Sequence, residues 1–166
     1  MRTRINSGFT LIELLVTIAV LAIMMALAAP SFVNMIENSR VTTQANTLLA
    51  AVNLARSEAV KQGTPFSIQN EPGGFVNGWC VIDGGLGVND CDTGTIIKRF
   101  PALEGVSVSQ GGVAGVTFDG RGYKIAPNAV VNIELEPPTC TSGSARMRRV
   151  SISMAGRATV TLEDCS

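Results

Sequence analysis

The sequence predicts an α+β fold in which one long N-terminal helix packs against a small antiparallel β-sandwich-like domain. Three features of the 166-residue chain support this fold: an apolar run of membrane length near its start, a helical stripe of apolar residues after that run, and short strand-like segments separated by turn residues in the remainder. We therefore expect a leader over residues 1–8, a hydrophobic helical segment over 9–29, an amphipathic helical segment over 30–62 and a globular β domain over 63–166.

The hydrophobic segment over residues 9–29 contains Glu13 as its only charged residue. About 20 apolar residues are enough to cross a bilayer, so the segment can serve as a transmembrane helix. A lone carboxylate is unfavourable there by about 2.5–3.5 kcal/mol at the bilayer centre, so Glu13 needs a partner. Arg2 and Arg4 precede the segment and favour a cytoplasmic N-terminus, which would place the chain after Pro30 on the other side of the membrane.

A cleaved secretory signal peptide is the competing interpretation of this segment. Ala26-Leu27-Ala28 would be its small-residue cleavage site. Pro30, close after that site, would hinder cleavage. The signal-peptide interpretation also gives no role to Glu13 or to the Gly8-Phe9 junction.

The helical pattern continues beyond Pro30 as an amphipathic helix. One apolar stripe along it contains Val41, Ala45, Leu48, Val52, Ala55 and Ala59. Pro30 lies inside the pattern and is expected to kink the helix or to mark a local break. Gly63 and Pro65 are typical of a helix C-terminus. A helix over residues 9–62 would be about 80 Å long at 1.5 Å per residue, so its first half must lie in a membrane or among other helices.

The chain after Gly63 has the pattern of a β domain. Its expected strands are rich in Val, Ile, Thr and Phe and are Phe66–Gln69, Phe75–Ile82, Thr95–Phe100, Val106–Ser109, Val116–Asp119, Val130–Glu136, Arg148–Met154 and Ala158–Leu162. Glycine-containing turns are expected over residues 119–122 and 155–157. Short strands joined by turns indicate antiparallel sheets packed on the amphipathic helix.

The composition limits the chemistry available to the chain. It contains no His, which excludes histidine-based acid/base catalysis and histidine metal ligands. The formal net charge is zero, so overall charge gives no argument for a nucleic-acid or membrane-surface partner. No nucleophile–base motif or phosphate-binding glycine pattern is present. We therefore predict that the protein is not an enzyme, and we predict no cofactor and no metal site.

Four cysteines follow the hydrophobic segment, and four cysteines allow three disulfide connectivities. We favour Cys80–Cys91, which would close a glycine-rich loop, and Cys140–Cys165, which would tie the C-terminus to the domain. Reduced thiols or a zinc site are the alternatives, but no C-x-x-C spacing is present. An exported domain would lie in an oxidising compartment, where disulfides persist.

Residues 8–32, GFTLIELLVTIAVLAIMMALAAPSF, resemble the N-terminal signature of type IV pilins and pseudopilins. This resemblance implies that a prepilin peptidase cleaves between Gly8 and Phe9 and methylates the new Phe9 amine. The hydrophobic helix would remain on the mature protein. Glu13 would then pair with the Phe9 amine of a neighbouring subunit in the filament, where two buried charges offset each other's desolvation when paired.

The second half of the chain resembles the GspH/FimT family of minor pilins and pseudopilins. The resemblance is carried by Ala55–Ala59, by the turn Phe118–Gly122 and by the ending Arg149–Ser153 with Gly156-Arg157. It implies the pilin fold and a FimT/FimU-like minor type IV pilin that helps to prime assembly at or near the filament tip. A minor pseudopilin of type II secretion is the alternative. The implied partners are other major and minor pilins or pseudopilins, the prepilin peptidase and the inner membrane, with the C-terminal domain in the periplasm.

A basic cluster near the C-terminus consists of Arg146, Arg148, Arg149 and Arg157. These arginines could bind the phosphates of double-stranded DNA, as in DNA uptake during natural transformation. FimT-type members of the resembling family are DNA-binding minor pilins with the C-terminal motif Gly-Arg-x-Arg. This chain has Gly156-Arg157-Ala158-Thr159, without the second arginine. The alternative is that the arginines pair with the carboxylates of Glu134, Glu136 or Glu163.

Overall fold

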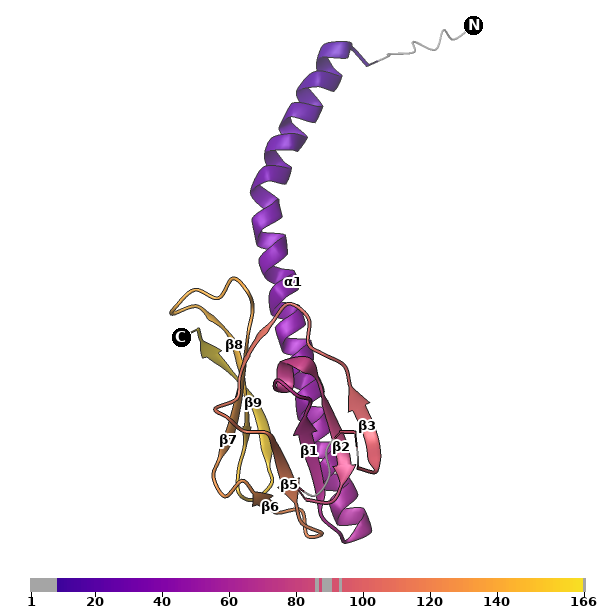
Figure 1. Cartoon of the computed structure of the whole chain (residues 1–166). Coiled ribbons are helices and arrows are strands. Elements are labelled where there is room, and N and C mark those ends of the chain that lie inside the picture. Colours follow the sequence, from indigo (N-terminus) through magenta and orange to yellow (C-terminus); the bar gives the residue numbers. More distant parts are fainter. Residues whose placement is uncertain (1–8, 86, 88–90, 93, 166) are drawn as a thin grey trace, which may run out of the picture. The chain divides into compact units, whose positions relative to one another are not determined.

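The structure is a computed structural model that describes residues 9–165 except 86, 88–90 and 93 (Figure 1). The chain separates into two compact units, Met1–Ile36 and Glu37–Ser166. The first unit is almost entirely helical where it is described, and the second contains the remainder of the helix and all the described strands.

The first unit contains the N-terminal part of helix α1 (Leu11–Gln62). Thr10 caps this helix, because its carbonyl accepts a hydrogen bond from the N–H of Leu14 (3.2 Å) and its hydroxyl accepts one from the N–H of Glu13 (3.3 Å). α1 is continuous through Pro30, so the local break that the sequence allowed there is absent. Proline removes one backbone hydrogen bond, but the flanking turns can continue the helix, as they do in many membrane-spanning helices.

In the second unit, α1 buries the apolar stripe that the sequence predicts. All its members are 0% exposed, namely Val41, Ala45, Leu48, Val52, Ala55 and Ala59. The predicted apolar stripe is therefore confirmed. It ends at Gly63, whose φ of 70° lies in the left-handed region and whose N–H donates to the carbonyl of Ala59 over 2.9 Å.

Two antiparallel sheets form the rest of the second unit (Figure 1). The five-stranded sheet has the order β3-β2-β1-β5-β6, with β1 (Phe66–Asn70), β2 (Trp79–Asp83), β3 (Ile96–Phe100), β5 (Gly115–Phe118) and β6 (Lys124–Ala126). The four-stranded sheet has the order β4-β7-β8-β9, with β4 (Ser107–Ser109), β7 (Val131–Glu136), β8 (Ala145–Ile152) and β9 (Ala158–Asp164).

Both sheets and the helix contribute to one hydrophobic core. Leu48 from α1, Phe66 from the first sheet and Ile133 from the second are all fully buried in it. Trp79 stacks on Phe100 with ring centroids 5.4 Å apart at one side of the core. This packing confirms the predicted α+β fold, a long helix on antiparallel sheets.

The prediction of a single strand over Phe75–Ile82 is wrong. The segment forms a 3-10 helix, η1 (Phe75–Asn77), and only then enters β2. Gly78 separates the two with a φ of 110°, and a Cβ atom at this position would lie 2.6 Å from the carbonyl oxygen of Phe100. The apolar pattern suggested a continuous strand, but the glycine takes a backbone conformation that interrupts the pleat.

Smaller differences affect β6 and β8. The sequence pattern does not predict β6, because this strand is too short to display a two-residue period. β8 starts earlier than expected and stops before Met154. It stops there because the chain turns, with the N–H of Gly156 donating to the carbonyl of Ser153 over 3.0 Å.

Candidate functional site

The first unit presents an apolar helical surface. Large apolar side chains over residues 11–36 are between 45% and 76% exposed. An 18-residue window of α1 has a mean hydropathy of 2.7, which makes α1 long enough and apolar enough to cross a membrane. Apolar exposure on this scale is unfavourable in water, so this surface requires lipid or other helices as its surroundings.

Glu13 lies in the first turn of α1, where the helix dipole favours a negative charge. Thr10 and Glu13 have the spacing of a capping box, T-x-x-E, and the N–H of Glu13 donates to the Thr10 hydroxyl. The T-x-x-E spacing is visible in the sequence, but the cap at Thr10 was not predicted from it. Phe9 is exposed, whereas Gly8 and the rest of the leader lie outside the described residues.

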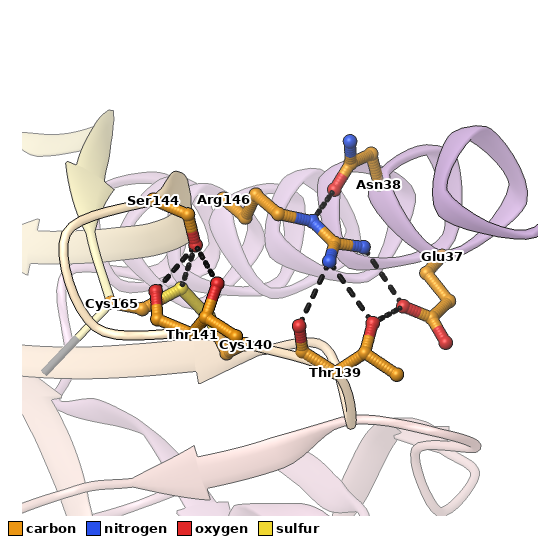
Figure 2. A network of polar contacts seen from close by, with 8 residues as sticks. All are labelled: Glu37, Asn38, Thr139, Cys140, Thr141, Ser144, Arg146 and Cys165. Atoms are coloured by element: carbon orange, nitrogen blue, oxygen red, sulfur yellow. Dashed lines mark hydrogen bonds and ion pairs between the residues drawn. A yellow bond between two sulfur atoms is a disulfide. The ribbon is translucent and has the colours of Figure 1, made fainter. Parts of the chain in front are cut away.

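Arg146 is bound to the start of the second unit's helix (Figure 2). Its guanidinium lies 2.8 Å from a carboxylate oxygen of Glu37, and it donates to Oδ1 of Asn38 over 2.8 Å and to the carbonyl of Thr139 over 2.9 Å. The side chains of Arg146 and Glu37 are only 14% and 16% exposed. Arg146 therefore fixes the segment before β8 against α1.

The carboxylate of Glu37 is the centre of this network. The Thr139 hydroxyl donates a hydrogen bond to it, and this bond is the main reason that the pKa of Glu37 lies below its ordinary 4.5. The guanidinium of Arg146 lowers the pKa further, while partial burial acts in the opposite direction. The network is therefore built around an ionised Glu37.

Two disulfides are present, with the pairing favoured from the sequence. Cys140 is bonded to Cys165 with a Cα–Cα distance of 5.8 Å, and Cys80 to Cys91 with a distance of 5.7 Å. The Ser144 hydroxyl donates to Sγ of Cys165 over 3.3 Å, so the C-terminus and the segment between β7 and β8 are joined beside Arg146 (Figure 2).

Arg149 bridges two carboxylates on the face of the four-stranded sheet. Its Nε lies 3.0 Å from Glu134, its directly opposite neighbour on β7, and its Nη1 lies 3.2 Å from Glu163 on β9. Glu134 and Glu163 are two of the three carboxylates that the sequence analysis named as possible partners of the arginines, as the alternative to DNA binding. Arg146 and Arg149 are thus both engaged by carboxylates.

The other two arginines of the cluster have different surroundings. Arg148 follows Arg146 by two positions and donates to the carbonyl of Met147 over 3.4 Å. Because neighbouring residues of a strand point to opposite faces, Arg148 and Arg149 do not share a surface. Arg157 is exposed in the turn between β8 and β9. The structure therefore does not gather the four arginines into one open basic patch.

Three segments of the second half that carry the GspH/FimT resemblance lie close to the side chain of Arg56. Its Nε donates to the carbonyl of Gly122 over 2.9 Å. Gly156 lies so close that a Cβ atom added to it would be 2.2 Å from that same carbonyl oxygen and 3.2 Å from the Arg56 Nε. The helix motif, the turn after β5 and the turn after β8 are therefore parts of one structural contact.

Asp119 organises the turn that contains Gly122. Its Oδ1 accepts hydrogen bonds from the N–H groups of Tyr123 (2.9 Å) and Arg121 (3.0 Å), and its Oδ2 lies 3.1 Å from the Arg121 guanidinium. The Tyr123 N–H is the main reason that the pKa of Asp119 lies below its ordinary 3.8. This motif residue stabilises a turn, and its carboxylate is ionised at neutral pH.

An exposed apolar helix with an acidic first turn, continued into an α+β domain of two antiparallel sheets, defines a protein of the type IV pilin and pseudopilin class. Residues 44–156 match the family described as Type II transport protein GspH, and residues 3–29 match the prokaryotic N-terminal methylation motif. The chain belongs to the GspH family. Members of this family are structural pilins and pseudopilins, which are not enzymes, and they assemble with other pilins or pseudopilins.

Solved structures of minor pilins and pseudopilins share the fold. The type IV minor pilin FimU of Pseudomonas aeruginosa is 22% identical over 76% of this chain and 90% of its own, with a TM-score of 0.61. The minor pseudopilin EpsH of the Vibrio cholerae type 2 secretion system is 12% identical over 74% of this chain and 97% of its own, with a TM-score of 0.52. A search of curated protein sequences found no significant match.

Proposed function

We propose that this protein is a minor type IV pilin. A prepilin peptidase cleaves it between Gly8 and Phe9 and methylates the Phe9 amine, and the mature chain joins a pilus at or near its tip, where it helps to prime assembly. The observation that carries this proposal is the exposed apolar surface over residues 11–36, with Glu13 as its only charged residue between Phe9 and Ile36. The match of residues 3–29 to the N-terminal methylation motif supports it.

Before assembly, residues 9–29 anchor the protein in the inner membrane, and the second unit lies in the periplasm. The capped first turn of α1 stabilises the Glu13 carboxylate partly, through the helix dipole. Cleavage of the Gly8–Phe9 peptide bond frees the α-amine of Phe9, which is close in sequence to Glu13. Pairing of Glu13 with the Phe9 amine of a neighbouring subunit then offsets the desolvation of both charges and fixes the axial register of the subunit.

Substitutions at Gly8 and Glu13 separate processing from assembly. Gly8→Val should leave the leader attached and abolish incorporation into filaments. Glu13→Ala should be cleaved and methylated normally but should fail to enter filaments. Glu104→Ala, which removes an exposed carboxylate of the second unit, should be processed normally and should also enter filaments. Mass spectrometry of the N-terminus and quantification of the protein in sheared filaments measure the two steps. Normal trimming of Gly8→Val, or normal incorporation of Glu13→Ala, would contradict the proposal.

A type II secretion pseudopilin is the second candidate, because the matching family carries the description of a type II transport protein. Deletion of the gene distinguishes the two functions. Loss of surface pili with normal protein secretion supports the pilin, and loss of secretion with normal pili supports the pseudopilin.

DNA binding during uptake is the remaining alternative, and Arg157 is its exposed arginine. Arg146 and Arg149 are bound to carboxylates, and the chain lacks the second arginine of the Gly-Arg-x-Arg motif. A gel-shift titration with double-stranded DNA at several salt concentrations tests this alternative. It requires binding that weakens with salt and with Arg157→Ala.

A further inference from the structure

We infer that the end of the second unit at which α1 stops is a docking surface for the globular domain of a different pilin subunit. The surface is an apolar patch rimmed by basic residues. The apolar patch consists of Val60, Tyr123, Ile125, Val130 and Met154, and the basic rim consists of Lys61, Arg121 and Arg157. This inference rests on the proposed function and specifies one contact through which the subunit would assemble.

The exposed apolar side chains of the second unit are unevenly distributed. The five members of the apolar patch are between 39% and 58% exposed. Among the described residues after 36, the other large apolar side chains with comparable exposure are Ile96 and Ile97 on β3 and Leu162 on β9. Single exposed apolar residues are ordinary, whereas a group rimmed by charged residues marks an interaction site.

Backbone contacts bring the segments of the apolar patch together. The N–H of Lys124, between Tyr123 and Ile125, donates to the carbonyl of Met154 over 3.2 Å. Val60 lies beside Gly122, because a Cβ atom built on Gly122 would be 3.0 Å from Cγ2 of Val60. In Figure 1, β6, the turn between β8 and β9 and the end of α1 lie at the same end of the second unit.

The buried side chain of Lys124 connects these segments through hydrogen bonds. It is only 2% exposed, and its amine donates to the carbonyls of Pro127 and Ala129 and to Sδ of Met154 (3.4 Å). The residue therefore links β6, the segment before Val130 and the turn that carries Met154. A surface whose segments are fixed in this way loses little conformational entropy on binding.

The charges of the rim indicate the partner. The side chains of Lys61 and Arg121 are 75% and 82% exposed, whereas their carboxylate partners, Glu58 and Asp119, are each 16% exposed. The guanidinium of Arg121 also lies 5.9 Å from the ring centre of Tyr123. The surface is therefore outwardly basic and contains tyrosine, methionine and arginine, residue types common in protein interfaces.

A complementary partner presents an apolar side chain surrounded by carboxylates. Two copies of this chain joined symmetrically through the same surface would bring their basic rims together, which is unfavourable.

Site-specific photo-crosslinking tests the inference in cells that assemble the filament. A photoreactive amino acid is placed at Ile125 in the full-length chain, at Leu162 as an equally accessible control outside the patch, and at Leu11 as a reporter of helix assembly. We expect Ile125 to give an adduct that mass spectrometry identifies as a different subunit with a methylated N-terminal amine. Tyr123→Ala should reduce this adduct about tenfold, as for an interface hot spot, and Leu162→Ala should not.

The outcomes distinguish this inference from the proposed function. Processed protein that crosslinks through Leu11 but gives no Ile125 adduct above the Leu162 control overturns the docking surface and leaves the pilin function standing. An Ile125 adduct with lipid, with DNA or with a second copy of this chain overturns the choice of partner. Retention of the leader on the wild-type chain, with no Leu11 crosslinks, overturns the proposed function and the inference with it.

Discussion

Arg56 donates a hydrogen bond from its Nε to the carbonyl oxygen of Gly122 over 2.9 Å, and Gly156 packs against that carbonyl. Gly122 lies in the turn between β5 and β6 of the five-stranded sheet, and Gly156 lies in the turn between β8 and β9 of the four-stranded sheet. One helical side chain therefore meets a turn from each sheet. The contact stabilises the end of the second unit where the proposed docking surface lies.

Gly156→Ala should strongly destabilise the second unit. Gly156 has a φ of 76°, and the new Cβ would lie 2.2 Å from the Gly122 carbonyl oxygen. Gly143→Ala is a matched control, because its φ is 79° but nothing lies within 4 Å of the added atom. We expect a loss of about 1–2 kcal/mol for the control from backbone strain alone, and about 1–3 kcal/mol more for Gly156→Ala from the clash.

Urea unfolding of residues 37–166 measures the difference between these two glycines. The core residues all lie within this range, so the unit can be studied without the apolar helix. Equal losses of stability for the two variants would show that Gly156 does not approach the Gly122 carbonyl as closely as described.

Arg146→Ala should lower the melting temperature of the second unit more than Arg157→Ala does. The first substitution leaves the Glu37 carboxylate and the Thr139 carbonyl without their guanidinium partner at a largely buried site. Arg157 is exposed, and substitutions at exposed positions usually change stability little. Thermal unfolding followed by circular dichroism compares the two, and similar melting temperatures would contradict the structural role of Arg146.

The stability of the second unit should fall in acid, partly through Glu37. The pKa of Glu37 in the folded state lies below its ordinary 4.5, so the unfolded chain binds the proton more readily. The stabilisation is therefore complete above pH 4.5 and is lost as the pH falls through the lower folded-state value. Glu37→Gln removes this part of the pH dependence. An unchanged acid profile in that variant would show that the Thr139 and Arg146 contacts do not favour the ionised form.

The long helix and most strands could be predicted because their patterns are local. The stripe from Val41 to Ala59 repeats at the helical period, and each member is buried. The role of Arg146 could not be predicted in this way, since its carboxylate partner, Glu37, is 109 positions away in the sequence. The interruption at Gly78 was missed because strand propensity does not reveal that Phe100 lies against that backbone.

Removal of each disulfide should destabilise the second unit according to the loop it closes. Cys140–Cys165 spans 25 residues and Cys80–Cys91 spans 11. The chain-entropy relation gives losses of about 3.5 and 2.8 kcal/mol for these loops. Paired Cys→Ser variants unfolded in urea measure the two values. A larger loss for the shorter loop would show that contacts around the cysteines, and not loop entropy, dominate.

Lys124→Met should destabilise the second unit by about 1–3 kcal/mol, because it keeps the aliphatic stem but leaves the Pro127 and Ala129 carbonyls without a donor. Lys61→Met, at a side chain 75% exposed, should stay within about 0.5 kcal/mol of the wild type.

Burial lowers the pKa of Lys124 below its ordinary 10.5, so the unfolded state binds more protons. The stability of the wild type therefore increases as the pH rises towards 10.5, and its advantage over Lys124→Met widens. Urea unfolding at neutral and alkaline pH measures this trend, and a constant difference between the two proteins would contradict it.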